Sequence, residues 1–182
     1  MSPLGAHVLH LTAEYWPYAR TGGLGEAVRG LALYQARAGI PVVAVLPLYR
    51  AVRETGVELE PSGDAFDVPV GPRRERARIW KVAGQRANEP RILLVEHEEY
   101  FDRAGIYGEA GADYPDNGRR FGFLSAAVTQ KLPQLVSGRP LIHAHDWHTA
   151  LAPIYLRTVY RGRAQYDQAG CVMSVHNAGF QG

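Results

Sequence analysis

The sequence contains one cysteine, Cys171, in 182 residues. A single thiol cannot form a disulfide within the chain, and it supplies no cysteine cluster for a zinc site. Because Cys171 lies in the apolar run CVMSV, we expect it to be a buried strand residue. The low cysteine content predicts a reducing, cytoplasmic environment.

Long apolar segments and an excess of one charge are also missing. No run approaches the roughly 18 apolar residues that a membrane-spanning helix needs, and the first residues, MSPLGAHVLHL, lack the basic-then-apolar pattern of a signal peptide. The 20 basic and 18 acidic side chains give a formal net charge of +2. The basic cluster GPRRERAR, residues 71–78, is typical of a solvated hairpin. We therefore expect neither a membrane nor a nucleic acid as a partner.

Three common catalytic motifs are absent as well. No Gly-Lys-Ser/Thr follows a glycine-rich loop, which excludes a Walker A site, and no G-x-S-x-G elbow supports a serine nucleophile. The glycines of ARTGGLGEAV, residues 19–28, are too close together for the dinucleotide fingerprint G-x-G-x-x-G, and a long segment separates them from the preceding strand.

Strand-like and helix-like segments alternate along the chain. Apolar runs predict buried strands at residues 7–13, 40–49, 91–97, 140–146 and 170–176. Short alternating segments between residues 56 and 82, broken by glycine and proline, predict a small antiparallel insertion. Alternation of this kind predicts an α/β domain with a doubly wound, mostly parallel, Rossmann-like sheet.

Helical patterns occupy the intervals between these strands. One helix is predicted from Leu24 to Gly39, a long one over residues 116–136 and a third over residues 147–160. In the first of them the apolar residues at helical spacing are Leu24, Ala27, Val28, Leu31 and Tyr34. Because the chain stops just after a strand, with no closing helix, we expect residues 1–182 to be one truncated domain.

Polar residues follow four of the predicted strands. The stretches ARTGGLGE, HEEYFDRAGIYG, HDWH and HNAGFQG each come after a strand, and ligands of parallel α/β sheets bind at the carboxyl ends of the strands. In the first stretch Gly22 and Gly23 lie at a helix N-terminus and Arg20 precedes them. Exposed N–H groups and a guanidinium suit a phosphate or a sugar hydroxyl. A turn in which the glycines only relieve strain is the alternative.

The segment HAHDWHTALAP places three histidines around one strand end. His143 and His145 share a strand face, while His148 begins the next helix. Without a second ligand cluster or a cysteine partner, we predict no metal site. Helix capping, with Asp146 as the N-cap, and contact of His148 with a sugar are the two other interpretations. Capping also explains one of the adjacent residues Asp116 and Asn117, but less readily both.

Five segments together resemble the bacterial glycogen synthase and plant starch synthase family. TAEYWPYARTGGLGEAVRGL is similar to the family's opening signature of an acidic residue, an aromatic-Pro pair and a Lys-Thr-Gly-Gly-Leu core. VEHEEYFDRAGIYG, YPDNGRRFGFLSAAV, HAHDWHTALAPIYL and SVHNAGFQG resemble four further signatures in the expected order. The resemblance covers nearly the whole chain.

This resemblance implies the N-terminal half of a two-Rossmann-domain glycosyltransferase (GT-B). The implied reaction is retaining transfer of glucose from ADP-glucose to the non-reducing 4-hydroxyl of an α-1,4-glucan such as glycogen. Neither a metal nor an organic cofactor is implied. The second Rossmann domain, which supplies most nucleotide contacts in the family, is expected to be missing, so the chain alone is expected to be inactive or nearly so.

The resemblance also implies roles for particular residues. Arg20 stands where the family usually has a lysine on the donor phosphates, Glu26 stands where it more often has aspartate, and both are expected to bind the donor. His148 matches the histidine that binds the transferring glucose, and with Asp116 it is predicted to be catalytic. The remaining predicted substrate-binding residues are Gly22, Gly23, Asn117, His145, Asp146, His176 and Asn177.

Two other functions stay open. The chain could be a stand-alone glucan-binding or regulatory module without catalysis, although a pure glucan binder has no use for the phosphate-side sequence RTGGL. It could also belong to a transferase with a different sugar-nucleotide donor, because the missing domain largely sets donor choice, and because Arg and Lys are not interchangeable at a tight site.

Overall fold

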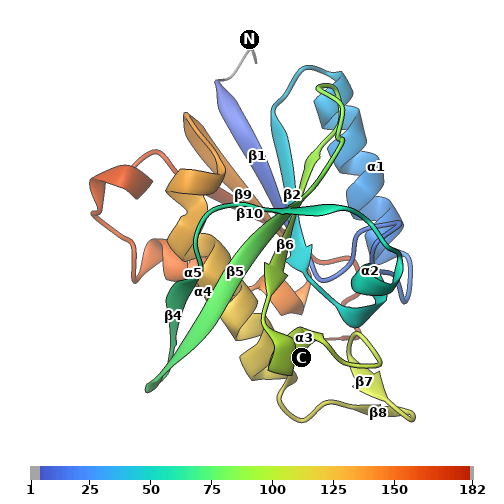
Figure 1. Cartoon of the computed structure of the whole chain (residues 1–182). Coiled ribbons are helices and arrows are strands. Elements are labelled where there is room, and N and C mark those ends of the chain that lie inside the picture. Colours follow the sequence, from blue (N-terminus) through green and yellow to red (C-terminus); the bar gives the residue numbers. More distant parts are fainter. Residues whose placement is uncertain (1–4, 181–182) are drawn as a thin grey trace.

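A computed structural model of the chain describes residues 5–180. Its centre is an eight-stranded sheet in the order β10-β9-β1-β2-β6-β5-β3, with β4 paired to β5 (Figure 1). Strands β7 and β8 form a separate two-stranded sheet. The strands are β1 (Ala6–Leu11), β2 (Val42–Pro47), β3 (Leu59–Pro61), β4 (Phe66–Val70), β5 (Arg73–Val82), β6 (Arg91–Glu96), β7 (Gly108–Glu109), β8 (Ala112–Asp113), β9 (Arg139–His145) and β10 (Gly170–Ser174).

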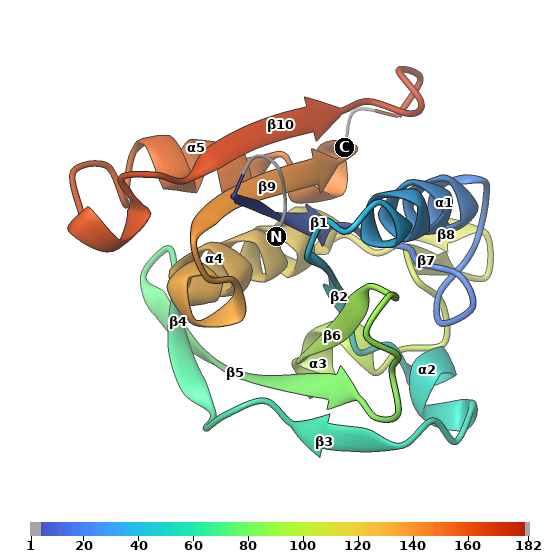
Figure 2. The ribbon, with the colours of Figure 1, turned by 90° about the horizontal axis from the view of Figure 1, so that it is seen from above.

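Helices cover both faces of this sheet. They are α1 (Leu24–Arg37), α2 (Arg50–Glu54), α3 (Glu98–Phe101), α4 (Asn117–Leu135) and α5 (Leu151–Arg157), with 3-10 turns η1 (Trp147–Thr149) and η2 (Ala164–Tyr166). Figure 2 shows α1 on one side of the sheet and α4 with α5 on the other. All six residues of β2 are buried between these layers, which is why that strand is apolar throughout.

The strand directions confirm the predicted fold class. Strands β10, β9, β1, β2 and β6 are parallel neighbours, and β5 joins β6 antiparallel and carries β3 and β4. The parallel strands therefore have a doubly wound, Rossmann-like order, and the region between residues 56 and 82 is the predicted antiparallel insertion. Chain connections diverge between β1 and β9, which is where a ligand site is expected in such a sheet.

Helix α1 contacts the sheet through small residues. Its buried positions are Gly25, Val28, Ala32 and Ala36, whereas Tyr34 is 74% exposed. The apolar stripe through Leu31 and Tyr34 is therefore not the core face. A Cβ on Gly25 would come within 3.0 Å of the carbonyl oxygen of Ala19, so the helix start and the preceding loop approach each other more closely than a side chain permits.

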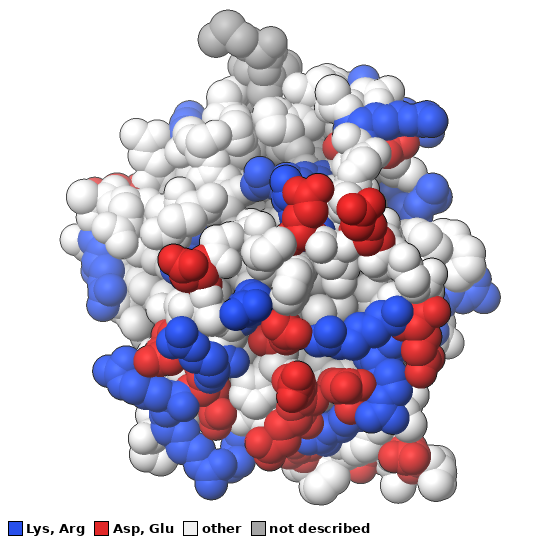
Figure 3. All heavy atoms as spheres, viewed as in Figure 1, with Lys and Arg blue, Asp and Glu red and all other residues white. Residues whose placement is uncertain are grey.

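Two further expectations need correction. The helix predicted over residues 147–160 is divided into η1 and α5, and Cys171 is partly exposed because β10 is an edge strand. The basic cluster at residues 71–78 does lie on the β4–β5 hairpin, where Arg76 pairs with Asp67 at 2.9 Å. Figure 3 shows blue and red side chains interspersed on this face. Among residues 5–180, no helix is long and apolar enough to cross a membrane.

The β10 edge exposes apolar side chains, and we expect the 182-residue chain to self-associate through it. Val172, Met173 and Val175 are 46%, 43% and 62% exposed, and an unpaired edge strand is a template for pairing with another chain. Replacing Met173 and Val175 with lysine should shift the protein towards monomer in sedimentation velocity, because charged edge residues oppose such pairing. Tyr34→Lys on the distant helix α1 is the control and should leave association unchanged. A monomeric unsubstituted chain would contradict the prediction.

Candidate functional site

A cavity of about 530 Å³ lies at the carboxyl ends of β1, β9 and β10. Its walls come from all four of the polar stretches that follow strands in the sequence. The lining residues are Glu14, Thr21, Gly22, Gly23, Leu24, Tyr107, Asp113, Asn117, Asp146, Trp147, His148, His176, Asn177 and Phe180. Folding thus brings together segments more than 150 positions apart in the sequence, as Thr21 and Asn177 show.

A larger cavity, of about 690 Å³, lies at the opposite end of the strands near His7. Two of its polar side chains fasten the backbone: Arg91 donates to the carbonyl oxygen of Leu135, and Gln85 bonds to main-chain groups with both of its amide atoms. Since ligands of parallel sheets bind at the carboxyl ends, we assign the functional site to the smaller cavity.

Glu14, at the end of the β1 segment, holds the glycine loop. Its Oε2 accepts hydrogen bonds from the backbone N–H of Thr21 at 2.8 Å and of Gly22 at 3.3 Å. Its Oε1 accepts from the hydroxyls of Thr21 and Tyr107, both at 2.7 Å. Burial by itself raises the pKa of this carboxyl, but the hydrogen bonds from Thr21, Tyr107 and Gly22 outweigh it and leave the pKa below its ordinary value. Glu14 is therefore an ionised anchor whose acceptor positions are filled.

The predicted glycines line the cavity, with one correction. A Cβ on either Gly22 or Gly23 would meet nothing within 4 Å, so neither glycine is required by packing, in contrast to Gly25. The N–H of Gly22, predicted to face a ligand, is bound to the Glu14 carboxylate instead. Both positions leave the backbone open to a close approach from the cavity side.

Arg20 and Glu26 are paired with each other, Nη1 to Oε1, at 2.5 Å. Both side chains are at least half exposed, and neither is among the residues that line the cavity. Arg20 also lies over the ring of Trp16, 5.4 Å from its centroid. Arg20 precedes the cavity-lining segment 21–24 and Glu26 follows it. A donor contact by either residue therefore stays a prediction.

Asp116 and Asn117 begin α4 and have different surroundings. Asp116 does not line the cavity, and its carboxylate accepts two hydrogen bonds from Arg103, at 2.7 and 2.6 Å. Arg103 holds the pKa of Asp116 below its usual value. The catalytic contact predicted for Asp116 therefore finds no support in this geometry. Neither this residue nor another caps α4 with a side chain.

Asn117 does line the cavity, and it connects two parts of the site. Its Nδ2 donates to the carbonyl oxygen of Tyr107 at 2.7 Å, and its Oδ1 accepts from Arg120 at 2.6 Å. Arg120 is fully buried and also donates to the carbonyl oxygens of Tyr100 and Ile106, at 2.6 and 3.0 Å. This guanidinium fixes the loop that carries Tyr107 to Glu14.

His148 is 8% exposed and lies between aromatic rings. It stacks on Trp147 with 4.1 Å between ring centroids and on Tyr107 with 4.6 Å, while Phe121 meets it edge-on. Burial lowers the pKa of His148 to about 4, so the imidazole is neutral at pH 7. Within residues 5–180 its buried Nδ1 has no hydrogen-bond partner. The side chain can therefore offer a neutral donor or acceptor, but not a positive charge.

Asp146 fastens the last described loop to the site. Its backbone lies at φ 57° and ψ −179°, a region that non-glycine residues rarely occupy. Its Oδ1 accepts from the backbone N–H of His176 at 2.6 Å, and its own N–H donates to Ser174 at 2.9 Å. Asp146 stands at the N-cap position of η1 without a side-chain capping bond. Its carboxylate positions the loop with His176 and Asn177 beside the cavity, in place of capping.

The prediction that His145 binds the substrate needs correction. It is fully buried, and its ring nitrogens bind those of His10 and His176, each at 2.9 Å. Sequence analysis missed His10, because only the strand register places it opposite His143. It also missed Glu14 and Tyr107, although both lie within the motifs TAEYWPYARTGG and GIYG that carried the family resemblance.

Comparisons with known proteins identify the relatives of this chain. A family model described as the starch synthase catalytic domain matches residues 7–182. The glycogen synthase of Syntrophotalea carbinolica is 35% identical over 176 residues, which are 97% of this chain and 36% of that protein. Glycogen synthase 1 of Geobacter sulfurreducens is 36% identical over 178 residues, 97% of this chain and 35% of that protein.

A solved structure has the same fold. It is the catalytic domain of starch synthase IV from Arabidopsis thaliana bound to ADP and acarbose, with a TM-score of 0.77 and 28% identity over 95% of this chain and 34% of that one. The chain thus spans a little over a third of the length of the curated relatives that it matches.

Proposed function

Since the match over residues 7–182 shows that the chain belongs to the starch synthase catalytic domain family, we propose that it forms one wall of a glucosyltransferase active site. The proposed reaction is retaining transfer of glucose from ADP-glucose to the non-reducing end of an α-1,4-glucan. The observation that carries the proposal is one cavity uniting the Thr21–Gly23 loop with Tyr107, His148 and His176. Binding of ADP and acarbose by the Arabidopsis relative supports a nucleotide and a sugar as ligands.

In this proposal the N-terminus of α1 receives the donor diphosphate. The 14-residue helix begins at Leu24, directly after the cavity-lining glycines, and its dipole and first N–H groups favour an anion. Arg20, beside this loop, adds a positive charge once it leaves Glu26. No metal or organic cofactor is proposed.

The glucose unit is proposed to lie on the opposite wall. Neutral His148 and Asn117 can exchange hydrogen bonds with its hydroxyls, and the ring of Trp147 offers an apolar face. Glu14 and Asp146 act as anchors for the two loops, because their carboxylates bind main-chain N–H groups. The residues of this chain thus bind and orient the donor, and preorganised charge around the departing diphosphate has to come from elsewhere in a longer protein.

Binding by the 182-residue chain tests the proposal. In two-dimensional NMR, ADP-glucose should shift the resonances of Thr21, Gly23, His148 and His176, while resonances around His7 at the other cavity stay unchanged. UDP-glucose is the comparison ligand: stronger binding of UDP-glucose would favour a transferase with another donor. Binding of maltotetraose without either nucleotide sugar would favour the glucan-binding module. Incorporation of labelled glucose into glycogen should be undetectable with the chain alone.

Arg20→Ala is expected to weaken ADP-glucose binding about tenfold, the effect of losing one charge-assisted contact, with little change for maltotetraose. Isothermal titration of both ligands measures the difference. Arg20→Lys is the matched control, because it keeps the charge, and it should retain most of the affinity. Equal losses for both ligands would mean that Arg20 supports the loop instead of binding the donor.

A further inference from the structure

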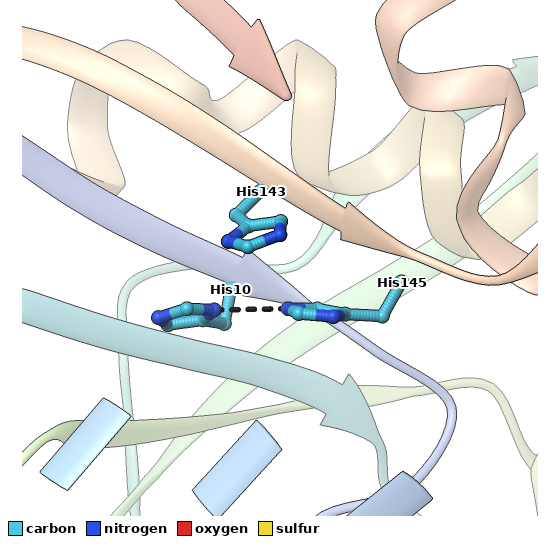
Figure 4. A group of neighbouring side chains, drawn as sticks. All are labelled: His10, His143 and His145. Carbon is cyan, nitrogen blue, oxygen red and sulfur yellow. Dashed lines mark hydrogen bonds between the residues drawn. The ribbon is translucent and has the colours of Figure 1, made fainter. Parts of the chain in front are cut away.

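A row of hydrogen-bonded side chains leads from α1 through the sheet to the cavity. Gln35 Oε1 lies 2.7 Å from Nε2 of His10, His10 Nδ1 lies 2.9 Å from Nε2 of His145, and His145 Nδ1 lies 2.9 Å from Nε2 of His176. The two central histidines are fully buried. Figure 4 shows His10 and His145 end to end, joined by their hydrogen bond, with the ring of His143 beside them.

The hydrogen-bond direction at one end of this row sets the tautomer of every ring in it. A neutral imidazole has one N–H and one bare nitrogen, and His10 and His145 each use both nitrogens within the row. An amide oxygen can only accept, so Gln35 Oε1 requires the proton of His10 to be on Nε2. His145 must then donate from its Nε2 to His10, and His176 must donate from its Nε2 to His145.

The two buried rings of the row, His10 and His145, are neutral at pH 7. Burial lowers the pKa of His10 to about 4, and the hydrogen bond to Gln35 opposes this only in part. Burial, with the neighbouring histidines, lowers the pKa of His145 to about 2. His143, which stacks on His145 and bonds Ser174 through Nε2, also has a pKa lowered by burial. No water or charge is needed to complete the hydrogen bonding of the two buried rings.

A metal ion shared by His10, His143 and His145 is the competing explanation. One ring nitrogen of each lies within 4.8 Å of the others. An ion must lie in the plane of every imidazole that ligates it, because the nitrogen lone pair lies in that plane. His143 and His145 instead stack face to face, 4.2 Å apart and 26° from parallel, and His10 and His145 already bond each other directly. The arrangement fits a hydrogen-bonded row better than a metal centre.

We propose that Gln35, His10 and His145 are positioning residues that hold His176 as its Nε2–H tautomer. His176 lines the cavity and its Nε2 is occupied by His145, so Nδ1 is the ring nitrogen left for a ligand. In this tautomer Nδ1 is a bare acceptor. It suits a hydroxyl group of a bound sugar and not a phosphate oxygen, which is itself an acceptor. The choice of ligand rests on the proposed function; the tautomer does not.

Two substitutions of similar size test the row at its far end. A methionine thioether is a weak acceptor and cannot donate, so Gln35→Met still favours a proton on Nε2 of His10. The lysine ammonium of Gln35→Lys can only donate and requires that nitrogen to be bare. The ¹⁵N chemical shifts of the histidine ring nitrogens, measured at neutral pH, distinguish protonated from bare nitrogens. We expect His176 to carry its proton on Nε2 in the unsubstituted chain and in Gln35→Met, and on Nδ1 in Gln35→Lys. Gln35 is only half-buried, and the backbone NMR spectrum shows whether each variant is folded.

Reversal of His10 without reversal of His176 would overturn the proposal, as would an Nδ1 proton on His176 in the unsubstituted chain. ADP-glucose affinity gives the second readout. Gln35→Lys should weaken ADP-glucose binding about tenfold, which is the effect of losing one hydrogen bond. The affinity of Gln35→Met should stay within about twofold of the unsubstituted chain. Unchanged affinity in Gln35→Lys would overturn the role in ligand binding. Because the ring shifts are measured without ligand, failure of the unsubstituted chain to bind ADP-glucose would count against the proposed function and not against the row.

Discussion

Glu14→Gln is expected to lower the free energy of unfolding by about 3 kcal/mol and the melting temperature by roughly 6–12 °C. Glutamine has the shape of glutamate, but its amide can present only one acceptor oxygen to four donors. Its NH₂ group would face either the backbone N–H groups of Thr21 and Gly22 or the hydroxyls of Thr21 and Tyr107, which now all donate to the carboxylate. Glu14 is buried, and donors that lose its carboxylate also lose a charge-assisted hydrogen bond.

The effect on binding should be as clear as the effect on stability. With the Thr21–Gly23 loop no longer fastened, we expect ADP-glucose affinity to fall at least about tenfold. Chemical denaturation and isothermal titration measure the two effects. Glu26→Gln is the matched control for stability: its exposed carboxylate pairs only at the surface, and we expect its free energy of unfolding to change by no more than about 0.5 kcal/mol. The interpretation of Glu14 as an anchor is wrong if the two variants lose the same amount of stability.

The stability difference between the unsubstituted chain and Glu14→Gln should also depend on pH. The folded-state pKa of Glu14 lies below its ordinary value of 4.5, so its contribution is fully present above that value and is lost as the pH falls through the folded-state pKa. The gap between the two proteins should therefore be constant near neutrality and narrow below about pH 4.5. A gap that widened on acidification would contradict the hydrogen-bond account.

Arg120→Leu is expected to cost about 3–5 kcal/mol of unfolding free energy. The guanidinium is fully buried and is the donor to three oxygens, on Tyr100, Ile106 and Asn117. A leucine side chain cannot donate, so all three oxygens would lose this hydrogen-bond donor. Because Asn117 and the loop before Tyr107 would lose their common anchor, the Tyr107 contact to Glu14 should weaken as well, and ligand binding should fall with stability.

Thermal and urea unfolding measure the loss of stability in Arg120→Leu, and a substitution of the neighbouring residue Arg119 is the control. Arg119→Leu changes an exposed arginine and should stay within about 0.5 kcal/mol of the parent. Arg120→Lys keeps the charge but not the forked geometry, so an intermediate loss of about 2 kcal/mol is expected. If Arg120→Leu unfolds within about 1 kcal/mol of the parent chain, the loop is held by its aromatic packing and not by the guanidinium.

Local patterns determined the fold class and the location of the site. Apolar runs marked the five parallel strands, most clearly β2, because a strand buried on both faces cannot alternate with polar residues. The helix starting at Leu24 and the long helix α4 also followed from spacing alone. The carboxyl-end rule then predicted that the glycine loop, the His148 segment and the His176 segment would meet, and all three line the cavity.

Side-chain partners were not predictable in the same way. Asp116 and Asn117 are adjacent in the sequence, yet one is bound by Arg103 outside the cavity and the other lines it. His145 and His148 come from the same motif, yet the first is buried inside the sheet and the second lies at the cavity wall. The buried face of α1 was missed because close helix–sheet packing selects small residues, and hydrophobic spacing weighs large ones more heavily.

The sequence by itself determined the five parallel strands, the helices α1 and α4, the family resemblance and the segments that form the site, since each of these depends on patterns within short stretches of chain. Only the tertiary structure decided which donor meets which acceptor. His10 and His145 are 135 positions apart, and Glu14 and Tyr107 are 93 positions apart. Hydrogen bonds act over about 3 Å, so their partners are set by strand register and loop packing, which no local pattern encodes.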